Sequence, residues 1–158
     1  MKHRMILCAT IVPLLLAPVP ACAADLAVEG VINRFVDGFN HGDLKAAAAT
    51  HATPAHIVDE VPPYSWSGAK ALADWAASEG ADANARGLTD QHVTISTPTR
   101  EMITGDHAYV VVPAVYSFTQ RGTKMAEQAQ ITFVLARGAD GWKITDWTWT
   151  GPNPSPVR

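Results

Sequence analysis

The sequence has very few cysteines: only Cys8 and Cys22 occur in 158 residues, and both lie near the N-terminus. The chain after residue 22 therefore has no disulfide, no thiolate nucleophile and no cysteine-based zinc site. No run of Lys and Arg forms a basic patch, which argues against a nucleic-acid-binding protein. The chain also lacks a nucleophile elbow and a phosphate-binding loop, which argues against acyl transfer and nucleotide hydrolysis.

Metal-binding spacing is also lacking. Five histidines follow residue 22, and none forms an HxH or HxxxH pair: His41, His51, His56, His92 and His107. We therefore expect no metal ion and no cofactor. A mononuclear site built from distant residues, such as the histidines on either side of Pro54, is the alternative.

Only one long hydrophobic run occurs, at residues 5–16, after the basic start at residues 2–4. The small residues Ala21–Ala23 then give the pattern of a signal-peptidase site. We predict a signal peptide over residues 1–23, cleaved after Ala23 or Ala24, and a periplasmic or secreted protein. Cleavage there removes Lys2 and Arg4, so the formal net charge changes from −3 to −5, since 12 − 2 = 10 basic residues face 15 acidic ones.

Two alternatives to a cleaved leader fit the sequence less well. In one, the hydrophobic run stays as an anchor, but it is short for a membrane span and no second hydrophobic segment follows it. In the other, Cys22 is lipidated, but Pro20 makes a poor match to that signal. We therefore expect no membrane association once the leader is cleaved.

The rest of the chain predicts helices first and strands afterwards. Spacings of three and four in the apolar residues predict a helix over 25–40, Asp43 caps a short helix over 44–50, and Ser67 caps a third over about 68–83. Strands are predicted at residues 55–59, 89–97, 100–103, 108–120, 124–137 and 142–150, with a small-residue loop at 81–87. This order predicts a single α+β domain over 24–150, with helices on one face of a curved sheet and a flexible tail over 151–158.

The stretch from His56 to Ala76 organises this arrangement. Asp59 ends the first strand, Tyr64 and Trp66 lie in a proline-broken loop, and Trp75 lies on the third helix. A carboxylate beside several aromatic side chains is typical of the mouth of a small-molecule pocket.

The FNHGD ending of the first helix, the segment HIVDEVPPYSWSG and the final GWKITDW resemble the nuclear transport factor 2-like superfamily. The bacterial SnoaL-like and ketosteroid-isomerase-like members look most similar, and the resemblance covers the whole chain after the leader. It implies a cone-shaped fold in which a curved antiparallel sheet and three helices enclose a pocket. It also implies frequent homodimers through the outer face of the sheet, and it leaves the chemistry open.

The resemblance to ketosteroid isomerase places Asp59 at the position of the general base. The tyrosine that donates a hydrogen bond in that family is replaced here by Phe35. The second donor, an acid, is replaced by Gln130 or Ile131. Because loss of one oxyanion donor typically costs about 100- to 1000-fold, ketosteroid isomerase activity is disfavoured.

Two roles for Asp59 follow from the residues themselves. Beside an aromatic pocket its pKa should rise, which suits a general base. Alternatively, it holds the strand-to-helix turn through loop N–H groups. In a regular strand Glu60 points to the opposite face, so we expect it to be solvated.

Two later strands supply further candidates. Tyr116 and Phe118 share one face of the strand at 108–120 and line the pocket or form plain core. Gln128 and Gln130 share a face of the next strand, where amides can bond a polar ligand. Trp147 and Trp149 alternate with the core residues of the last strand. We expect them on the outer face as a homodimer contact, or in the pocket if a bulge shifts the register.

The sequence thus favours an exported SnoaL-like protein that binds a small, partly apolar molecule, with ligand-binding candidates Tyr64, Trp66, Trp75, Tyr116, Phe118 and Gln130. One rival is an isomerase, cyclase or dehydratase-type enzyme that uses Asp59 as its base. The other is a dimerisation module with a filled cone.

Overall fold

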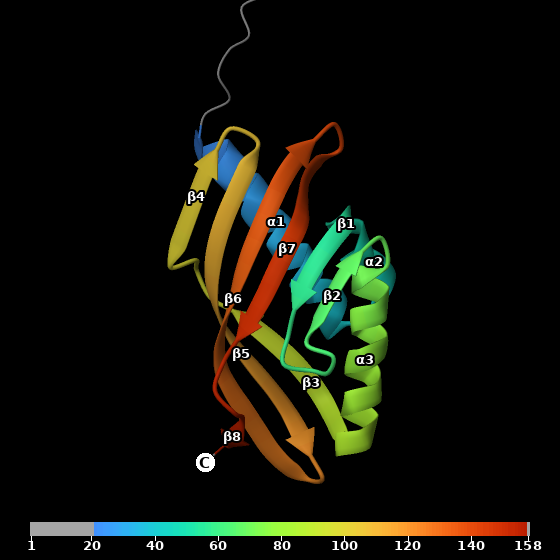
Figure 1. Cartoon of the computed structure of the whole chain (residues 1–158). Helices are drawn as coiled ribbons and strands as arrows, with labels where there is room; N and C mark the ends of the chain where they lie inside the picture. Colours follow the sequence, from blue (N-terminus) through green and yellow to red (C-terminus); the bar gives the residue numbers. More distant parts are fainter. Residues whose placement is uncertain (1–20, 158) are drawn as a thin grey trace, which may run out of the picture.

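The computed structural model describes residues 21–157 (Figure 1). Its helices are α1 (Ala21–Asn40), α2 (Leu44–Ala49) and α3 (Ala71–Arg86). Its strands are β1 (His51–Val58), β2 (Ser65–Gly68), β3 (Leu88–Ile95), β4 (Arg100–Thr104), β5 (His107–Gln120), β6 (Thr123–Gly138), β7 (Gly141–Thr150) and β8 (Ser155–Pro156). Figure 1 shows α1 crossing behind the sheet and α3 standing beside β1, β2 and β3.

All eight strands belong to one sheet, and its main order is β2-β1-β7-β6-β5-β3. Strands β3, β5, β6 and β7 pair antiparallel along this order, while β1 lies parallel to β7. A curved, open sheet with a few helices confirms the predicted α+β class. The predicted antiparallel meander is also confirmed, apart from the parallel pairing of β1.

The N-terminal helices form where the sequence predicts them. Asp43 caps α2, because its side chain accepts a hydrogen bond from the Ala46 N–H at 2.9 Å. Gly42 takes the left-handed conformation at a φ of 66°, which turns the chain from α1 into α2. The apolar face of α1 lies in the core, with Val28 and Ile32 almost fully buried.

Asn40, the last residue of α1, fixes the helix to the sheet. Its side-chain amide donates to the Val93 carbonyl at 2.9 Å and accepts from the Val93 N–H at 2.8 Å. Both polar groups of one β3 residue are thereby satisfied by a side chain. This bond pair fixes the end of α1, with Phe39 and Phe35 on it, against the inner face of the sheet.

The proline-broken segment after β1 is not the open loop that the sequence suggested. Residues 65–68 form β2, which pairs antiparallel with β1, and Trp66 lies opposite Ile57. Ser67 therefore belongs to a strand, and its predicted role as a helix cap is wrong. Lys70 precedes α3 instead, with no side-chain hydrogen bond to the helix end.

Helix α3 has the predicted length of about 16 residues but starts and ends three residues later than predicted. It continues through the expected loop at 81–87 and ends at Arg86, where Gly87 takes the left-handed conformation at a φ of 67°. The alanine-rich composition of this segment favours helix, which explains the extension. Strand β1 likewise begins at His51, earlier than predicted.

A bulge in β7 decides where two tryptophans point. Val134 pairs with Asp146, but the next residue of β6, Leu135, pairs with Ile144, so Thr145 is the extra residue. This insertion places Trp147 and Trp149 on the same face as Ile144. The expectation that they lie on the outer sheet face is wrong, and the bulged alternative is correct.

The structure tests the predicted tail at the C-terminal end but not most of the predicted leader at the N-terminal end. Residues 155–156 form β8 against β6, so this part of the tail is paired rather than free. Most of the predicted leader falls on residues 1–20, outside the described part of the chain. Between residues 21 and 157, no helix has the length and apolar composition that a membrane span requires.

Candidate functional site

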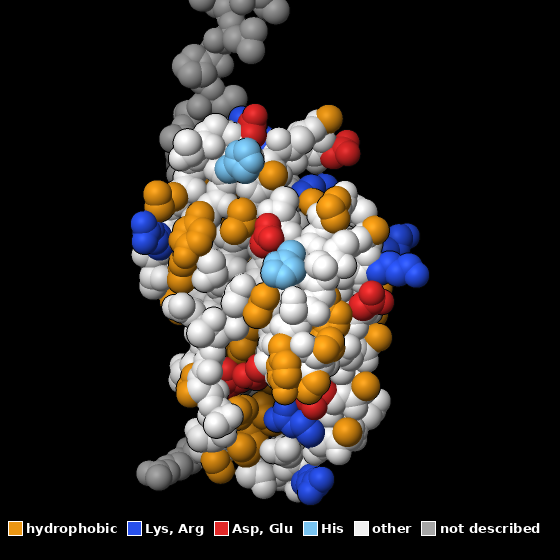
Figure 2. Space-filling view, in the orientation of Figure 1, with side chains coloured by type: hydrophobic (Ala, Val, Ile, Leu, Met, Phe, Trp, Pro, Cys, Tyr) orange, Lys and Arg blue, Asp and Glu red, His pale blue; other side chains and the backbone are white. Residues whose placement is uncertain are grey.

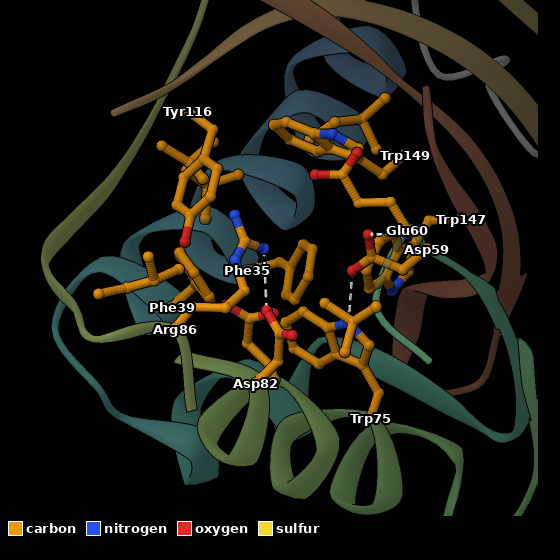
Figure 3. A pocket seen from close by; sticks show the side chains of 16 residues that line it. Phe35, Phe39, Asp59, Glu60, Trp75, Asp82, Arg86, Tyr116, Trp147 and Trp149 are labelled. Carbon is orange, nitrogen blue, oxygen red and sulfur yellow. Dashed lines mark hydrogen bonds and ion pairs between the residues drawn. The ribbon is translucent and has the colours of Figure 1, made fainter. Parts of the chain in front are cut away.

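A pocket opens between α1, α3 and the inner face of the sheet (Figure 3). It has a cavity volume of about 60 Å³, room for more than one water molecule. Six of the sixteen residues that line it are aromatic: Phe35, Phe39, Trp75, Tyr116, Trp147 and Trp149. The rings of Trp75 and Trp147 meet edge to face, with their centroids 5.0 Å apart. In Figure 2, which has the orientation of Figure 1, acidic side chains lie beside hydrophobic ones in the lower half of the molecular surface.

Asp59 lies on the wall of this pocket, directly after the last residue of β1. Its carboxylate accepts hydrogen bonds from the Trp75 indole N–H at 2.6 Å and from the Glu60 backbone N–H at 2.7 Å. Burial raises the pKa of Asp59, and the two hydrogen bonds oppose that rise. Asp59 is therefore an oriented carboxylate beside aromatic walls, and its oxygens can accept further bonds from a ligand.

Glu60 lines the pocket, and the carboxyl group of Glu127 lies next to it without lining the pocket itself. Glu127, on β6, is 1% exposed, and its Oε1 accepts a hydrogen bond from the Trp149 indole at 2.9 Å. Its Oε2 is buried and accepts no bond from an N–H or O–H of the described residues. Burial and the adjacent Glu127 carboxyl raise the pKa of Glu60 to about 8. At neutral pH Glu60 is therefore mostly protonated.

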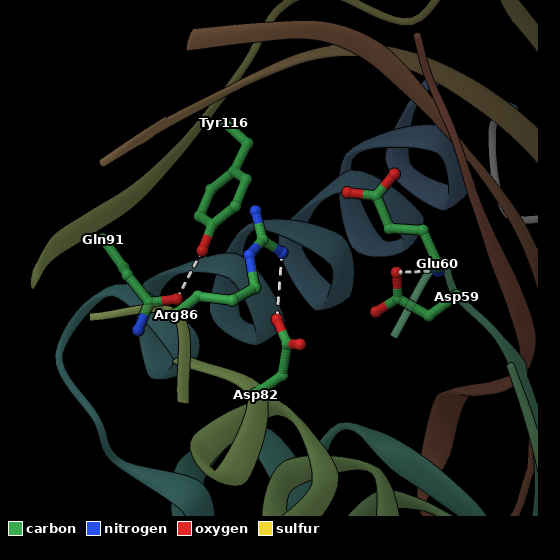
Figure 4. Close-up of polar contacts among 6 residues, drawn as sticks. All are labelled: Asp59, Glu60, Asp82, Arg86, Gln91 and Tyr116. Carbon is green, nitrogen blue, oxygen red and sulfur yellow. Dashed lines mark hydrogen bonds and ion pairs between the residues drawn. The ribbon is translucent and has the colours of Figure 1, made fainter. Parts of the chain in front are cut away.

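Helix α3 contributes a polar row to the same pocket. Glu79, Asp82 and Arg86 follow Trp75 at spacings of four, three and four, which places all of them on one helix face. The Arg86 guanidinium donates to Asp82 at 2.9 Å, as Figure 4 shows. Burial, with the nearby Asp59 and Asp82, raises the pKa of Glu79 to about 7.

Tyr116, on β5, lines the pocket as well. Its hydroxyl donates to the side-chain oxygen of Gln91 on β3 (Figure 4). Burial raises its pKa, and the carboxylate of Glu79 acts in the same direction. Tyr116 is therefore a neutral hydrogen-bonding group at physiological pH.

Three of the predicted site residues come together as expected: Asp59, Trp75 and Tyr116 all line the pocket. The other four predicted residues do not line it. Tyr64 is 58% exposed in the turn before β2, and Trp66 is buried on β2. Phe118 is buried behind Tyr116, with ring centroids 4.8 Å apart, and Gln130 is exposed on the outer face of β6.

The acids of the pocket other than Asp59 were missed. Glu60 lines the pocket, so the prediction that it points to the opposite face is wrong: β1 ends at Val58, and strand alternation does not extend to residue 60. The row on α3 had a signal in the sequence, because its polar residues continue the helical face that carries Trp75. Glu127 had one too, since it shares its alternation with the apolar residues Ile131 and Phe133.

Comparison with known proteins identifies the family. Residues 24–152 match the family described as NTF2-like protein (DUF6841). The chain belongs to this family. No curated protein matches the chain. Within residues 21–157, no group of three or more His, Cys, Asp or Glu side chains is arranged to hold a metal ion.

Solved structures with the NTF2-like fold are similar along most of the chain. The hexachlorocyclohexane dehydrochlorinase LinA-type3 from Novosphingobium barchaimii LL02 has a TM-score of 0.74 at 13% identity, over 87% of this chain and 92% of its own. A putative scytalone dehydratase from Novosphingobium aromaticivorans DSM 12444 has a TM-score of 0.69 at 9% identity, over 87% and 90%. A ketosteroid isomerase-like protein from Erwinia carotovora atroseptica SCRI1043 has a TM-score of 0.64 at 19% identity, over 82% and 96%. At these identities the similarity shows the fold alone.

Proposed function

We propose that this NTF2-like protein is an exported SnoaL-like protein that binds a small, partly apolar molecule in its pocket. The observation that carries the proposal is the open cavity, which six aromatic side chains surround without filling. Small-molecule sites are typically concave, mostly apolar and supplied with a few convergent polar groups. A cavity also argues against the rival dimerisation module, which requires a filled cone.

Native mass spectrometry of the purified protein tests this proposal. Val93 lines the pocket, so Val93→Phe is expected to fill the cavity and expel a ligand carried through purification. Val115→Phe is the matched control, because Val115 lies on the opposite face of the sheet on β5. A small-molecule adduct that persists equally in both variants would place the ligand elsewhere and contradict the proposal.

Export is a separate part of the proposal and has its own test. It rests on the basic start, the hydrophobic run and the small residues Ala21–Ala23. Expression of the full chain in a bacterial host should give a protein in the periplasmic fraction or the culture medium. Its intact mass should correspond to a chain that begins at Ala24 or Asp25. A full-length mass there, or a protein confined to the cytosol, contradicts export with cleavage.

The predicted homodimer also remains a proposal, now on a different basis. Trp147 and Trp149 point inward, so they are not available to the outer face of the sheet. Met102 and Tyr109 are 49% and 40% exposed and are paired across β4 and β5. Light scattering during gel filtration should give twice the chain mass, and Tyr109→Glu should reduce it to the single-chain mass. A wild-type protein that runs as a monomer contradicts the dimer.

A second candidate function is proton transfer with Asp59 as the base. The observation that favours it is a carboxylate oriented by two N–H donors beside an aromatic wall, where burial raises its basicity. Glu60, protonated at neutral pH, supplies a proton donor to the same pocket, although Phe35 replaces the expected tyrosine. Solved structures of this fold include proteins named as a dehydrochlorinase and a putative dehydratase, which is compatible with an elimination.

A probe with an activated C–H bond tests this candidate without knowledge of the substrate. The base-catalysed opening of 5-nitrobenzisoxazole releases a coloured phenolate and needs only an apolar pocket and a carboxylate. Asp59→Asn should lower the protein-dependent rate by about 100-fold or more, and Asp74→Asn, an exposed acid on α3, should not. Equal rates in the wild type and Asp59→Asn contradict the role of Asp59 as a base.

A further inference from the structure

The side chains of the pocket carry an excess of negative charge. Four acidic residues line it, Asp59, Glu60, Glu79 and Asp82, and Arg86 is the one basic residue among the lining residues. Arg86 is already paired with Asp82 at 2.9 Å. Three carboxyl groups around the cavity therefore have no cationic partner in the lining. An anionic ligand entering this space would meet repulsion from each of them that is ionised.

The Glu60–Glu127 pair adds a buried carboxyl group next to the acidic lining of the pocket. The Glu127 side chain is 1% exposed, and its Oε2 accepts no hydrogen bond from an N–H or O–H of the described residues. The group beside it is the carboxyl of Glu60, which is another acceptor when ionised. Two neighbouring ionised carboxylates repel each other, and a proton or a positively charged donor placed beside them relieves that repulsion.

The walls of the same cavity suit an organic cation better than a metal ion. The faces of tryptophan, tyrosine and phenylalanine attract ammonium and guanidinium groups, most strongly where water is excluded. The chain shows this preference internally, since the Arg86 guanidinium lies 5.9 Å from the centre of the Phe118 ring. Aromatic walls offer no ligands to a metal ion, and among residues 21–157 no metal-binding cluster occurs.

We propose that the ligand of this pocket is an organic cation, namely a protonated amine attached to an apolar or aromatic body. Its ammonium group lies among the carboxylates of Glu60, Glu79 and Asp59, and its body lies against the tryptophans. An ammonium N–H takes the place of the proton that Glu60 carries at neutral pH. This inference rests on the proposed ligand-binding function and adds the charge class of the ligand.

Two probes of the same length and different charge test the inference. 2-Phenylethylammonium and 2-phenylethanol share the aromatic ring and the two-carbon linker, and both are soluble in water. Binding is followed by isothermal titration calorimetry on the purified protein. At about pH 8 the ammonium should bind at least about tenfold more tightly than the alcohol.

The preference should also depend on pH, because the acids must ionise to attract the cation. The titratable groups that line the site are Asp59, Glu60, Glu79, Asp82, Arg86 and Tyr116, and Glu127 lies next to Glu60. Since the pKa values of Glu60 and Glu79 are raised, affinity for the ammonium should increase from about pH 6 to about pH 8.5, with release of protons on binding. The affinity for 2-phenylethanol should change little over the same range.

Glutamine variants locate the effect while preserving side-chain size. Glu60→Gln and Glu79→Gln should each reduce affinity for the ammonium about fivefold or more and leave the alcohol unaffected. Asp74→Asn, which removes an exposed charge from the same helix, is the matched control and should change neither affinity. Because Glu60 lies at the surface end of the pocket, its replacement is not expected to prevent folding.

Each result has one meaning. Equal affinity for ammonium and alcohol refutes the cationic ligand and leaves the proposed pocket function intact. Benzoate serves as a third, anionic probe in the same titrations. If it binds more tightly than the ammonium, the cationic ligand is refuted in favour of an anion held by Arg86. A preference for the ammonium that survives in both glutamine variants refutes the role of these acids. If none of the three probes binds, the proposed ligand-binding function fails together with the inference.

Discussion

The buried imidazole of His51 makes the stability of the fold depend on pH in a way that can be worked out from its surroundings. The ring is 8% exposed, Nδ1 lies 3.0 Å from the Ala47 carbonyl, and the Phe35 ring packs edge to face at 4.9 Å. Nε2 is buried without a hydrogen-bond partner among the described residues. Burial lowers the pKa of His51 from 6.5 to about 4, because the imidazolium loses its hydration there.

Since the unfolded chain takes up this proton at a higher pH than the folded chain, stability falls as the pH decreases from 6.5 toward 4. A fall of the pKa from 6.5 to about 4 corresponds to about 3 kcal/mol of unfolding free energy. That loss is a large share of the stability of a typical domain. The raised pKa values of Asp59, Glu60 and Glu79 act in the opposite direction, so the effect must be isolated by comparison with a variant.

Urea unfolding followed by tryptophan fluorescence between about pH 4 and pH 7 measures this effect. His51→Leu removes the titrating group, while Thr50 still donates to the Ala47 carbonyl at 2.7 Å. The difference in unfolding free energy between the wild type and His51→Leu should change by about 3 kcal/mol across this range. His107→Leu, at an exposed histidine, should not reproduce that change. A difference that stays constant with pH would show that the imidazole is not the cause.

Three further outcomes follow from the packing and the charges. Gly38→Ala should lower stability by about 1–3 kcal/mol through overpacking, because its Cβ would lie 2.8 Å from a backbone nitrogen of α2. Gly30→Ala, whose Cβ would have its nearest neighbour at 3.6 Å, should instead gain up to about 1 kcal/mol. Urea unfolding midpoints that shift in the same direction in both variants contradict this. The raised pKa of Glu79 makes the wild type lose stability as the pH rises from 4.5 to about 7, and Glu79→Gln should reduce this loss. If urea denaturation shows the same difference in stability between pH 5 and pH 8 in the variant as in the wild type, the expectation is wrong. Trp75→Phe removes an N–H donor and should raise the pKa of Asp59, measured by carbon NMR of the carboxyl group, and a fall or no change contradicts the hydrogen bond.

The fold was predictable where one local pattern dominated. The 3.6-residue periodicity of α1 and the cap at Asp43 specify the N-terminal helices, and the turn residues at Gly105 and Gly122 specify the hairpins of the long strands. Strand β2 was missed because two prolines precede it and conceal a four-residue strand that gains its stability only by pairing with β1.

The site was predictable only in part, because the sequence does not show where a strand changes register. The alternation from Trp142 to Thr150 reads as a regular strand, and in a regular strand Trp147 faces away from Ile144. A single extra residue at Thr145 reverses this, since side-chain direction in a strand alternates with a period of two. The bulge is visible only in the pairing with Val134 on the neighbouring strand.

Glu127 is the strongest indication that the acidic character of the pocket is functional. A carboxyl group buried on the inner face of a strand costs stability, and an apolar residue of similar size would pack there at no such cost. The surroundings instead accommodate it: Trp149 donates to one oxygen, and a Cβ at Gly151 would lie 1.9 Å from that oxygen, so only glycine leaves it room. Glu60, two residues after the end of β1, lies next to the same carboxyl group. An arrangement that holds two acids together at the edge of an aromatic cavity is costly for an empty pocket, and a positively charged ligand group would remove that cost.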